Sequence, residues 1–373
     1  MEQAVTHVTT VHPRYDTRIF YKECSSLAAN GYRVRLVVAD GLGAETRNGV
    51  SIVDVGVASG GRIGRMLVSV WRAFRAALAT KPECVHLHDP ELLVTVPVFR
   101  ALGVRVFYDM HENVPKQILT KVWLPVQMRW GMSKGVQLIE RLVLRGVPVV
   151  MAEKSYAHDY PWLRNVSVVQ NFPVLPDVQE SSEGPFDVFT VGYIGGVTRE
   201  RGVLAVLDAV AELRSAGRVI EFECLGPVSS NVAECEAFDK AIADGWLRAP
   251  GRVDGAVGLK RISRCHVGVA VLTPLPNYVE SWPTKMFEYM ALGLPVIASD
   301  FPMYRGVVDA EACGLLAKPE RHQEIVDALV FMMDNPEDAK SMGVRGRDAA
   351  LHRFSWANEE SKLLRFYSEL SPR

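Results

Sequence analysis

The sequence predicts an α/β protein with two parallel-sheet domains. Its 373 residues exceed the roughly 250–300 residues at which a single hydrophobic core usually stops growing. Short apolar runs alternate with helical patterns from end to end, which is typical of parallel sheets with helices on both faces. Residues 172–185 are rich in proline, serine and acidic residues, as an interdomain linker is. We therefore expect one domain over residues 1–175 and a second over residues 186–354.

The apolar runs and the residues that flank them locate the individual elements. In the first half, strands are predicted at residues 4–9, 33–39, 51–57, 84–88, 104–109, 148–152 and 166–170. In the second half, they are predicted at residues 189–194, 219–225, 267–272 and 295–299. Helices are predicted at residues 18–30, 202–215, 286–292 and, as a last amphipathic helix, 354–367.

Composition narrows the class of protein. Hydrophobic residues make up 48% and charged residues 23% of the chain, as in a soluble globular protein, and no apolar run approaches the ~20 residues of a membrane span. The first residues read as a strand and not as a signal peptide. A net charge of −1 without a dense basic face excludes nucleic acid as a partner. The six cysteines form no C-x-x-C pair, which predicts a reduced cytoplasmic protein without structural zinc.

Polar side chains follow three successive strands of the first half, at the strand ends where parallel sheets bind ligands. They are His12, Asp16 and Arg18 after the first strand, Asp89 after the strand at 84–88, and Asp109 and His111 at the end of the next strand. We expect Asp16 and Arg18 to contribute to binding the ligand at this edge of the sheet. In the alternative, Asp16 only caps a helix and Arg18 is a surface charge.

One stretch of the second half reads as a loop, a helix and a buried strand. Ser281 is suited to cap that helix, which places Thr284 and Lys285 at its N-terminus, where free N–H groups and the helix dipole favour a phosphate. Glu280 and Glu288 are eight residues apart, one before the helix and one within it. Carboxylates accept hydrogen bonds from sugar hydroxyls. The same spacing also arises on a solvated helix face, which is the alternative.

A second phosphate-binding turn is predicted after the first strand of the second half. Gly195 and Gly196 are followed by Arg199 and Arg201, so backbone and cations approach the same place. No D-x-D pair ends a strand, and with these cations available no divalent metal is expected.

These motifs resemble the retaining glycosyltransferases of family 4, also called group 1, of the polysaccharide-biosynthesis type. The resemblance rests on the E-x7-E spacing and on the runs His-Pro-x-x-Asp-Thr-Arg-Ile, His-Asp-Pro-Glu-Leu, Tyr-Asp-x-His-Glu, Tyr-Ile-Gly-Gly, Glu-Arg-Gly and Phe-Ser-Trp. It covers nearly the whole chain. It implies the GT-B fold, in which two Rossmann-like domains face each other across a cleft, and retention of the anomeric configuration.

The resemblance also implies roles for individual residues. His111 matches the histidine at the sugar-reaction centre, and Arg201 and Lys285 match the basic pair that clamps the donor diphosphate. Glu288 matches the ribose-binding glutamate, and Glu280 matches the one near the transferred sugar. The C-terminal helix, residues 355–373, is expected to return to the first domain and complete it.

Two positions depart from the family pattern. Many relatives have Phe-Gly after the first glutamate, whereas this chain has Ser281-Trp282-Pro283, and proline has no N–H to offer the donor. Relatives also often carry an arginine where this chain has Gly196. Contacts to the sugar hydroxyls are therefore left open.

The expected function is transfer of a hexose from a UDP- or GDP-sugar to a saccharide acceptor, free or lipid-linked, without a metal or other cofactor. The alternatives are another GT-B enzyme, such as a nucleotide-sugar epimerase or a phosphorylase, and a non-catalytic nucleotide-sugar-binding partner of another transferase. Two acid-free basic stretches, residues 55–82 and 113–139, read either as solvated helices or as a contact with the inner face of the cell membrane.

Overall fold

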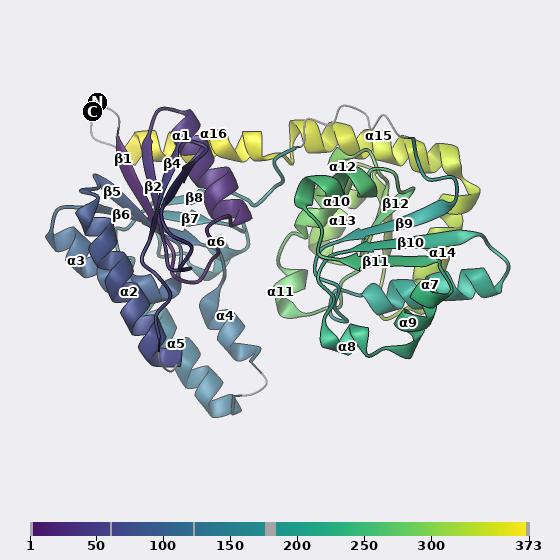
Figure 1. Cartoon of the computed structure of the whole chain (residues 1–373), viewed down its shortest axis with the longest axis horizontal. Coiled ribbons are helices and arrows are strands. Elements are labelled where there is room, and N and C mark those ends of the chain that lie inside the picture. Colours follow the sequence, from purple (N-terminus) through teal and green to yellow (C-terminus); the bar gives the residue numbers. More distant parts are fainter. Residues whose placement is uncertain (1–2, 60–61, 122–123, 176–183, 371–373) are drawn as a thin grey trace. The chain divides into compact units, whose positions relative to one another are not determined.

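The chain folds into two compact units (Figure 1). The computed structural model describes residues 3–59, 62–121, 124–175 and 184–370, so residues 176–183 of the predicted linker lie outside the described residues. The first unit comprises Met1–Asn171 and Glu359–Arg373, and the second comprises Phe172–Asn358.

The first unit is built on an eight-stranded sheet with the strand order β3-β4-β2-β1-β5-β6-β7-β8. The strands are β1 (Ala4–Val8), β2 (Arg33–Val38), β3 (Glu45–Arg47), β4 (Val50–Asp54), β5 (Cys84–Leu87), β6 (Arg105–Met110), β7 (Val149–Met151) and β8 (Val166–Val168). All neighbouring strands are parallel except β3 and β4, which are antiparallel. Every residue of β1 and β5 is buried, because parallel strands are covered on both faces.

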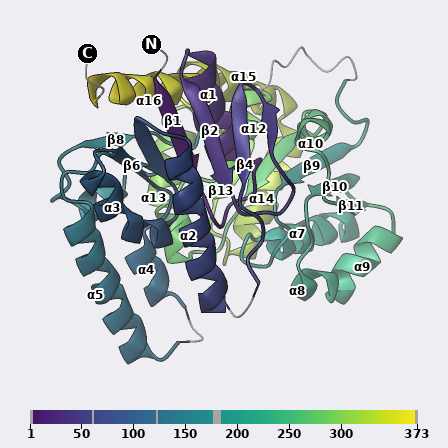
Figure 2. The same cartoon turned by 60° about the vertical axis from the view of Figure 1, so that its left-hand side comes forward.

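The helices and short helical turns of this unit are η1 (Thr17–Cys24), α1 (Ser25–Ala29), α2 (Arg62–Ala79), η2 (Pro90–Thr95), α3 (Val96–Ala101), α4 (Val114–Leu119), α5 (Val126–Val143), α6 (Tyr156–Asp159) and α16 (Trp356–Leu370). The single helix predicted at residues 18–30 is in fact a π-helix, η1, followed by α1. π-helical turns are rare and frequent at functional sites. Figure 2 shows α2, α4 and α5 from a second side.

The second unit has a six-stranded, entirely parallel sheet with the order β11-β10-β9-β12-β13-β14. Its strands are β9 (Phe189–Ile194), β10 (Ile220–Leu225), β11 (Leu247–Gly251), β12 (Val267–Ala270), β13 (Val296–Ser299) and β14 (Gly314–Ala317). Its helices are α7 (Val203–Ser215), α8 (Ser230–Ala233), α9 (Glu236–Ala243), α10 (Gly255–Ile262), α11 (Pro276–Val279), α12 (Thr284–Ala291), α13 (Pro302–Val308), α14 (His322–Asp334) and α15 (Pro336–His352).

The last helix, α16, packs on the first unit. The Tyr367 ring stacks on Phe107 with centroids 4.6 Å apart, and its hydroxyl lies 2.6 Å from His86 Nδ1. The Glu359 carboxylate accepts a hydrogen bond from the backbone N–H of Gln170 at 2.8 Å. These contacts join the C-terminal segment to a sheet that begins at the opposite end of the sequence.

Candidate active site

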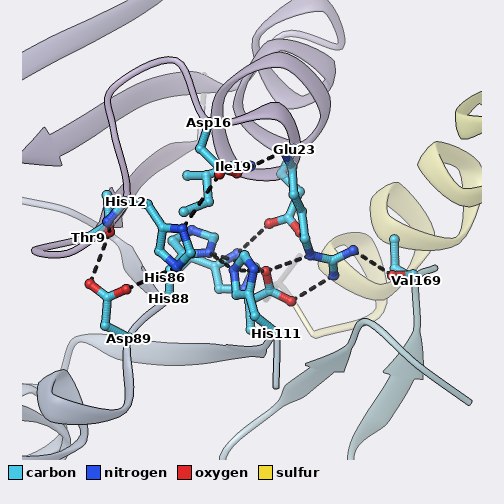
Figure 3. Close-up of polar contacts among 12 residues, drawn as sticks. Thr9, His12, Asp16, Ile19, Glu23, His86, His88, Asp89, His111 and Val169 are labelled. Atoms are coloured by element: carbon cyan, nitrogen blue, oxygen red, sulfur yellow. Dashed lines mark hydrogen bonds and ion pairs between the residues drawn. The ribbon is translucent and has the colours of Figure 1, made fainter. Parts of the chain in front are cut away.

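In the first unit, the polar residues predicted at three strand ends lie together. β1, β5 and β6 are parallel neighbours, so their carboxyl ends meet at one edge of the sheet. Figure 3 shows His12, Asp89 and His111 converging there. The His12 and His111 rings are stacked with centroids 5.0 Å apart. The fold therefore brings polar residues from three separate strand ends to one place.

A buried carboxylate, Asp109, organises this edge. Its oxygens accept two hydrogen bonds from the Arg18 guanidinium, at 2.9 and 2.7 Å, and Oδ2 lies 2.7 Å from His111 Nε2. Burial opposes the ionisation of Asp109, but Arg18 and His111 outweigh it and hold the pKa of this carboxyl well below its usual range. Because a carboxylate only accepts, Nε2 of His111 carries the proton in this contact and Nδ1 is left for another partner.

Arg18 has a different role from the predicted contact with a ligand. Its side chain is 3% exposed, and its Nη1 donates a hydrogen bond to the carbonyl of Val169 at 2.8 Å. Its Nε, which donates to Asp109, also lies 3.1 Å from Glu23 Oε1. Arg18 therefore positions Asp109 from inside the unit. It is neither the predicted ligand contact nor the surface charge of the alternative.

Asp16 acts as the cap of η1, as the alternative predicted. Its Oδ1 accepts hydrogen bonds from the backbone N–H groups of Arg18 and Ile19, at 2.8 and 2.9 Å. Its other oxygen lies 3.5 Å from His12 Nδ1. Hydrogen bonding to Asp16, against the opposing effect of burial, raises the pKa of His12 above its ordinary value.

In the second unit, α12 is held against the sheet by a tyrosine. The Tyr289 hydroxyl accepts a hydrogen bond from the backbone N–H of Ile194 at 3.0 Å, and its ring fills the space that a side chain on Gly268 would occupy. Residues four apart lie on the same face of a helix. Lys285, four residues before Tyr289, is therefore directed toward the end of β9.

At that end, two cations approach a glycine turn. A Cβ atom on Gly195, which has φ +127°, would lie 3.2 Å from Lys285 Nζ and 3.4 Å from an Arg201 guanidinium nitrogen. Lys285 Nζ also lies 3.8 Å from the centre of the Tyr193 ring. Sequence reasoning assigned no role to Tyr193, although its place just before the glycines was a usable signal.

Lys285 is buried, with 7% of its surface exposed. Within the described residues its Nζ has no hydrogen-bond partner. Burial, followed by the neighbouring Arg201 guanidinium, lowers the pKa of Lys285 well below its ordinary value of 10.5, although Glu288 raises it. A buried ammonium without a partner is costly, so this position favours an anion.

The other predicted donor residues lie within α12 or just before it. α12 begins at Thr284, with Pro283 as its N-cap and no side-chain cap, so the prediction that Ser281 caps the helix is wrong. Glu288 is half-buried within α12, and Glu280 is exposed after α11.

The glycine turn leads directly into α7. Gly202, with φ +71°, is the N-cap of that helix. Gly196 lies beside Arg201, whose guanidinium carbon would be 3.9 Å from a Cβ at that glycine. Arg199 is exposed. The structure therefore brings Arg201, and not Arg199, to the glycine turn with Lys285.

Two family models match the chain. The model for glycosyl transferases group 1 matches residues 178–349, and the model for the glycosyl transferase 4-like domain matches residues 17–160. The 4-like model matches the first parallel-sheet unit and the group 1 model matches the second. Two such Rossmann-like domains define a GT-B glycosyltransferase, so the predicted fold class is confirmed. The chain belongs to the group 1 glycosyltransferases.

Individual relatives agree with this assignment. The chain is 26% identical to an MMP alpha-(1->4)-mannosyltransferase of Mycolicibacterium hassiacum over 81% of this chain and 74% of the relative. It is 24% identical to an alpha-D-kanosaminyltransferase of Streptomyces kanamyceticus, but that match spans 48% of this chain and 45% of the relative.

Solved structures share the fold over the whole length. Sucrose-phosphate synthase from Thermosynechococcus elongatus has a TM-score of 0.74 at 17% identity, covering 99% of both chains. HepE of Anabaena in complex with UDP and glucose has a TM-score of 0.72 at 12% identity, covering 99% of this chain and 100% of the other.

Proposed function

We propose that this chain is a retaining hexosyltransferase that moves a sugar from a UDP- or GDP-sugar to a saccharide acceptor in glycan biosynthesis. The observation that carries the proposal is the convergence of Lys285 and Arg201 on the Gly195 turn, with the Lys285 ammonium buried and without a hydrogen-bond partner among the described residues. A nucleoside diphosphate supplies the missing anion. The UDP complex of the similar Anabaena protein supports this donor class.

The same arrangement has a catalytic use. As the bond between sugar and diphosphate breaks, negative charge gathers on the leaving group, and preorganised cations stabilise it more in the transition state than in the ground state. In this proposal Lys285 and Arg201 hold the diphosphate, and Thr284 offers it the start of α12. Glu288 accepts from the ribose and Glu280 from the transferred sugar.

His111 is proposed to act at the sugar-reaction centre. Asp109 binds its Nε2, so the ring presents Nδ1 to a sugar hydroxyl in a fixed orientation. Lys285 and Arg201 neutralise the diphosphate charge that a divalent metal neutralises in other transferases. We therefore propose that donor binding needs no metal ion. Affinity for UDP that rises more than tenfold when Mg²⁺ or Mn²⁺ is added would contradict this.

A ligand panel tests the donor. UDP-, GDP- and ADP-sugars are screened by thermal unfolding, and a donor at ~100 times its dissociation constant should add about 2.7 kcal/mol of stability. Replacing Arg201 with alanine should abolish the shift, whereas the control Lys240→Ala, an exposed cation of α9, should keep it. No stabilisation by any sugar nucleotide would refute the proposal.

We further propose that α5 attaches the enzyme to an anionic bilayer, where lipid-linked acceptors lie. The helix exposes large apolar side chains along its length; these are Val126, Met128, Trp130, Met132, Leu138, Ile139 and Leu142. Its basic residues Lys134 and Arg141 are exposed, while its acidic residue, Glu140, is buried. An interfacial helix has this combination of apolar and cationic groups.

The other basic helix considered for membrane contact, α2, exposes fewer large apolar side chains than α5. Val70 and Phe74 are buried, whereas Leu67 and Trp71 are each 59% exposed. Among the described residues, no helix has the length and apolarity required to cross a bilayer. The attachment that we propose is peripheral, at the cytoplasmic surface of the membrane.

Flotation with phosphatidylglycerol vesicles at low salt tests the attachment. The unmodified chain should float with the vesicles and dissociate at high salt, since electrostatic attraction is screened. The double variant Trp130→Glu/Leu138→Glu should stay at the bottom of the gradient. The control Val344→Glu changes an exposed apolar residue of α15 and should float normally. Equal flotation of all three proteins would refute a role for α5.

A further inference from the structure

The interior of the first unit contains four side chains of the types that bind metal ions. His7 lies in β1, Glu23 in η1, His86 in β5, and His88 directly after β5. Each is at most 2% exposed. One ligand atom from each lies within 4.8 Å of the corresponding atoms of the other three. Figure 3 shows Glu23, His86 and His88 behind the strand ends that carry His111.

The three imidazole rings are packed against one another. The His86 centroid lies 4.8 Å from those of both His7 and His88, and the nitrogens His7 Nδ1 and His88 Nε2 are 2.8 Å apart. The neutral form of imidazole has a lone pair for a metal ion.

Several polar atoms of this cluster are unsatisfied. Among the described residues, His7 Nε2, His86 Nε2 and both oxygens of Glu23 are buried without a hydrogen-bond partner. Glu23 Oε1 has an ion pair with Arg18 Nε at 3.1 Å, but Arg18 is already neutralised by two hydrogen bonds to Asp109. Buried polar atoms are seldom left unpaired, and four in one cluster call for a ligand.

We propose that His7, Glu23, His86 and His88 bind one structural zinc ion. Three imidazoles and one carboxylate make four nitrogen and oxygen ligands, a set that suits tetrahedral zinc. The Tyr367 hydroxyl, 2.6 Å from His86 Nδ1, is an outer partner that orients that ring. The absence of paired cysteines predicted no structural zinc, but these ligands need no cysteine.

The site is separate from the proposed donor clamp and takes no part in sugar transfer. It borders the candidate reaction centre, because His88 Nδ1 lies 3.1 Å from His111 Nε2. It also touches α16 through Tyr367. Zinc would thus join β1, η1 and β5 behind His111 and hold α16 against them.

Elemental analysis of the full chain, purified without an affinity tag or chelator, tests the proposal directly. We expect about one zinc per chain, with X-ray absorption showing three nitrogen ligands and one oxygen ligand at about 2.0–2.1 Å. The variants Glu23→Gln and His86→Gln should each retain at most a tenth of that zinc. The control His352→Gln removes an exposed imidazole and should retain all of it.

A refolding experiment keeps the proposal falsifiable if those variants do not fold. The unmodified chain is unfolded in guanidinium and refolded either with excess zinc or with EDTA. The zinc-refolded protein should keep one zinc after desalting and melt at a higher temperature. Less than a tenth of a zinc per chain with identical melting would overturn the proposal, and so would zinc that persists in both variants. None of these readouts depends on transferase activity.

Discussion

Replacing Lys285 with methionine should stabilise the free protein while it removes donor binding. The ammonium is buried beside Arg201 and has no hydrogen-bond partner among the residues described. Leaving a buried donor unsatisfied costs about 1–3 kcal/mol, more when it is charged. Methionine fills a similar volume without a charge, so the free energy of unfolding should rise by about 1–3 kcal/mol. In a domain of 150–250 residues each kcal/mol raises Tm by about 2–4 °C.

The same substitution should weaken catalysis by roughly a hundredfold or more, since one preorganised charge is lost at the leaving group. UDP affinity, measured by calorimetry, should fall with it. A Lys285→Met protein that melts lower than the unmodified chain, yet binds UDP within threefold of it, would refute the assignment of Lys285 as a diphosphate ligand. Such a result would mean that Lys285 is a structural residue.

The depressed pKa of Lys285 adds a pH dependence with a definite sign. A bound diphosphate favours the ammonium and raises its pKa toward or above the ordinary 10.5. Between the free and bound values, binding takes up one proton, and affinity falls about tenfold for each pH unit of increase. Lys285→Arg keeps its charge throughout, so its proton uptake and its slope should vanish. Calorimetry in two buffers of different ionisation enthalpy measures the uptake, and equal slopes for both proteins would contradict this reasoning.

Three further predictions concern stability. Gly202→Ala would place a Cβ against the backbone carbonyl oxygen of Val271, just after β12, and should lower the free energy of unfolding by more than about 3 kcal/mol in denaturant. The control Gly217→Ala has a similar positive φ but open space around it, and should lower it by about 1 kcal/mol. Burial raises the pKa of Glu140, which accepts from the Tyr160 hydroxyl, to about 7. The unfolded chain binds that proton less tightly, so stability should fall by up to about 3 kcal/mol from pH 4.5 to 7, and Glu140→Gln should flatten this fall. Deleting residues 355–373 should speed hydrogen exchange in β5 and β6; unchanged exchange would show that α16 is dispensable there.

Sequence reasoning succeeded where the chain's own periodicity carries the information. Strands such as β1 and β9 are buried on both faces and are therefore rich in apolar residues. Three strands were missed. β3 is a short antiparallel edge of polar residues, β11 contains arginine and proline, and β14 is apolar but has four residues. Parallel order then places successive strand ends together, which is why His12, Asp109 and His111 lie in one place.

The roles of single side chains depended on partners distant in the sequence. Arg18 was expected at the surface or at the ligand, because nothing near it in the chain could bury it. Its partners Asp109 and Val169 are 91 and 151 positions away. The buried histidines left a local signal, since His86 and His88 alternate along a strand and therefore share one face. That signal indicates that the two histidines share an environment, but it does not indicate that the Glu23 carboxylate lies beside them.

Lys285 shows how local and distant information combine at the donor turn. The helix start and the positive charge are visible in the sequence, but burial of the ammonium comes from Tyr289 in α12 and Tyr193 in β9. Gly268 leaves room for the Tyr289 ring, and this lets α12 lie close enough to the sheet for Lys285 to reach Gly195. The chain thus holds a cation where water is excluded and no protein anion satisfies it within the described residues. Such an arrangement lowers the stability of the free protein, and in the function that we propose an anionic ligand supplies the missing partner.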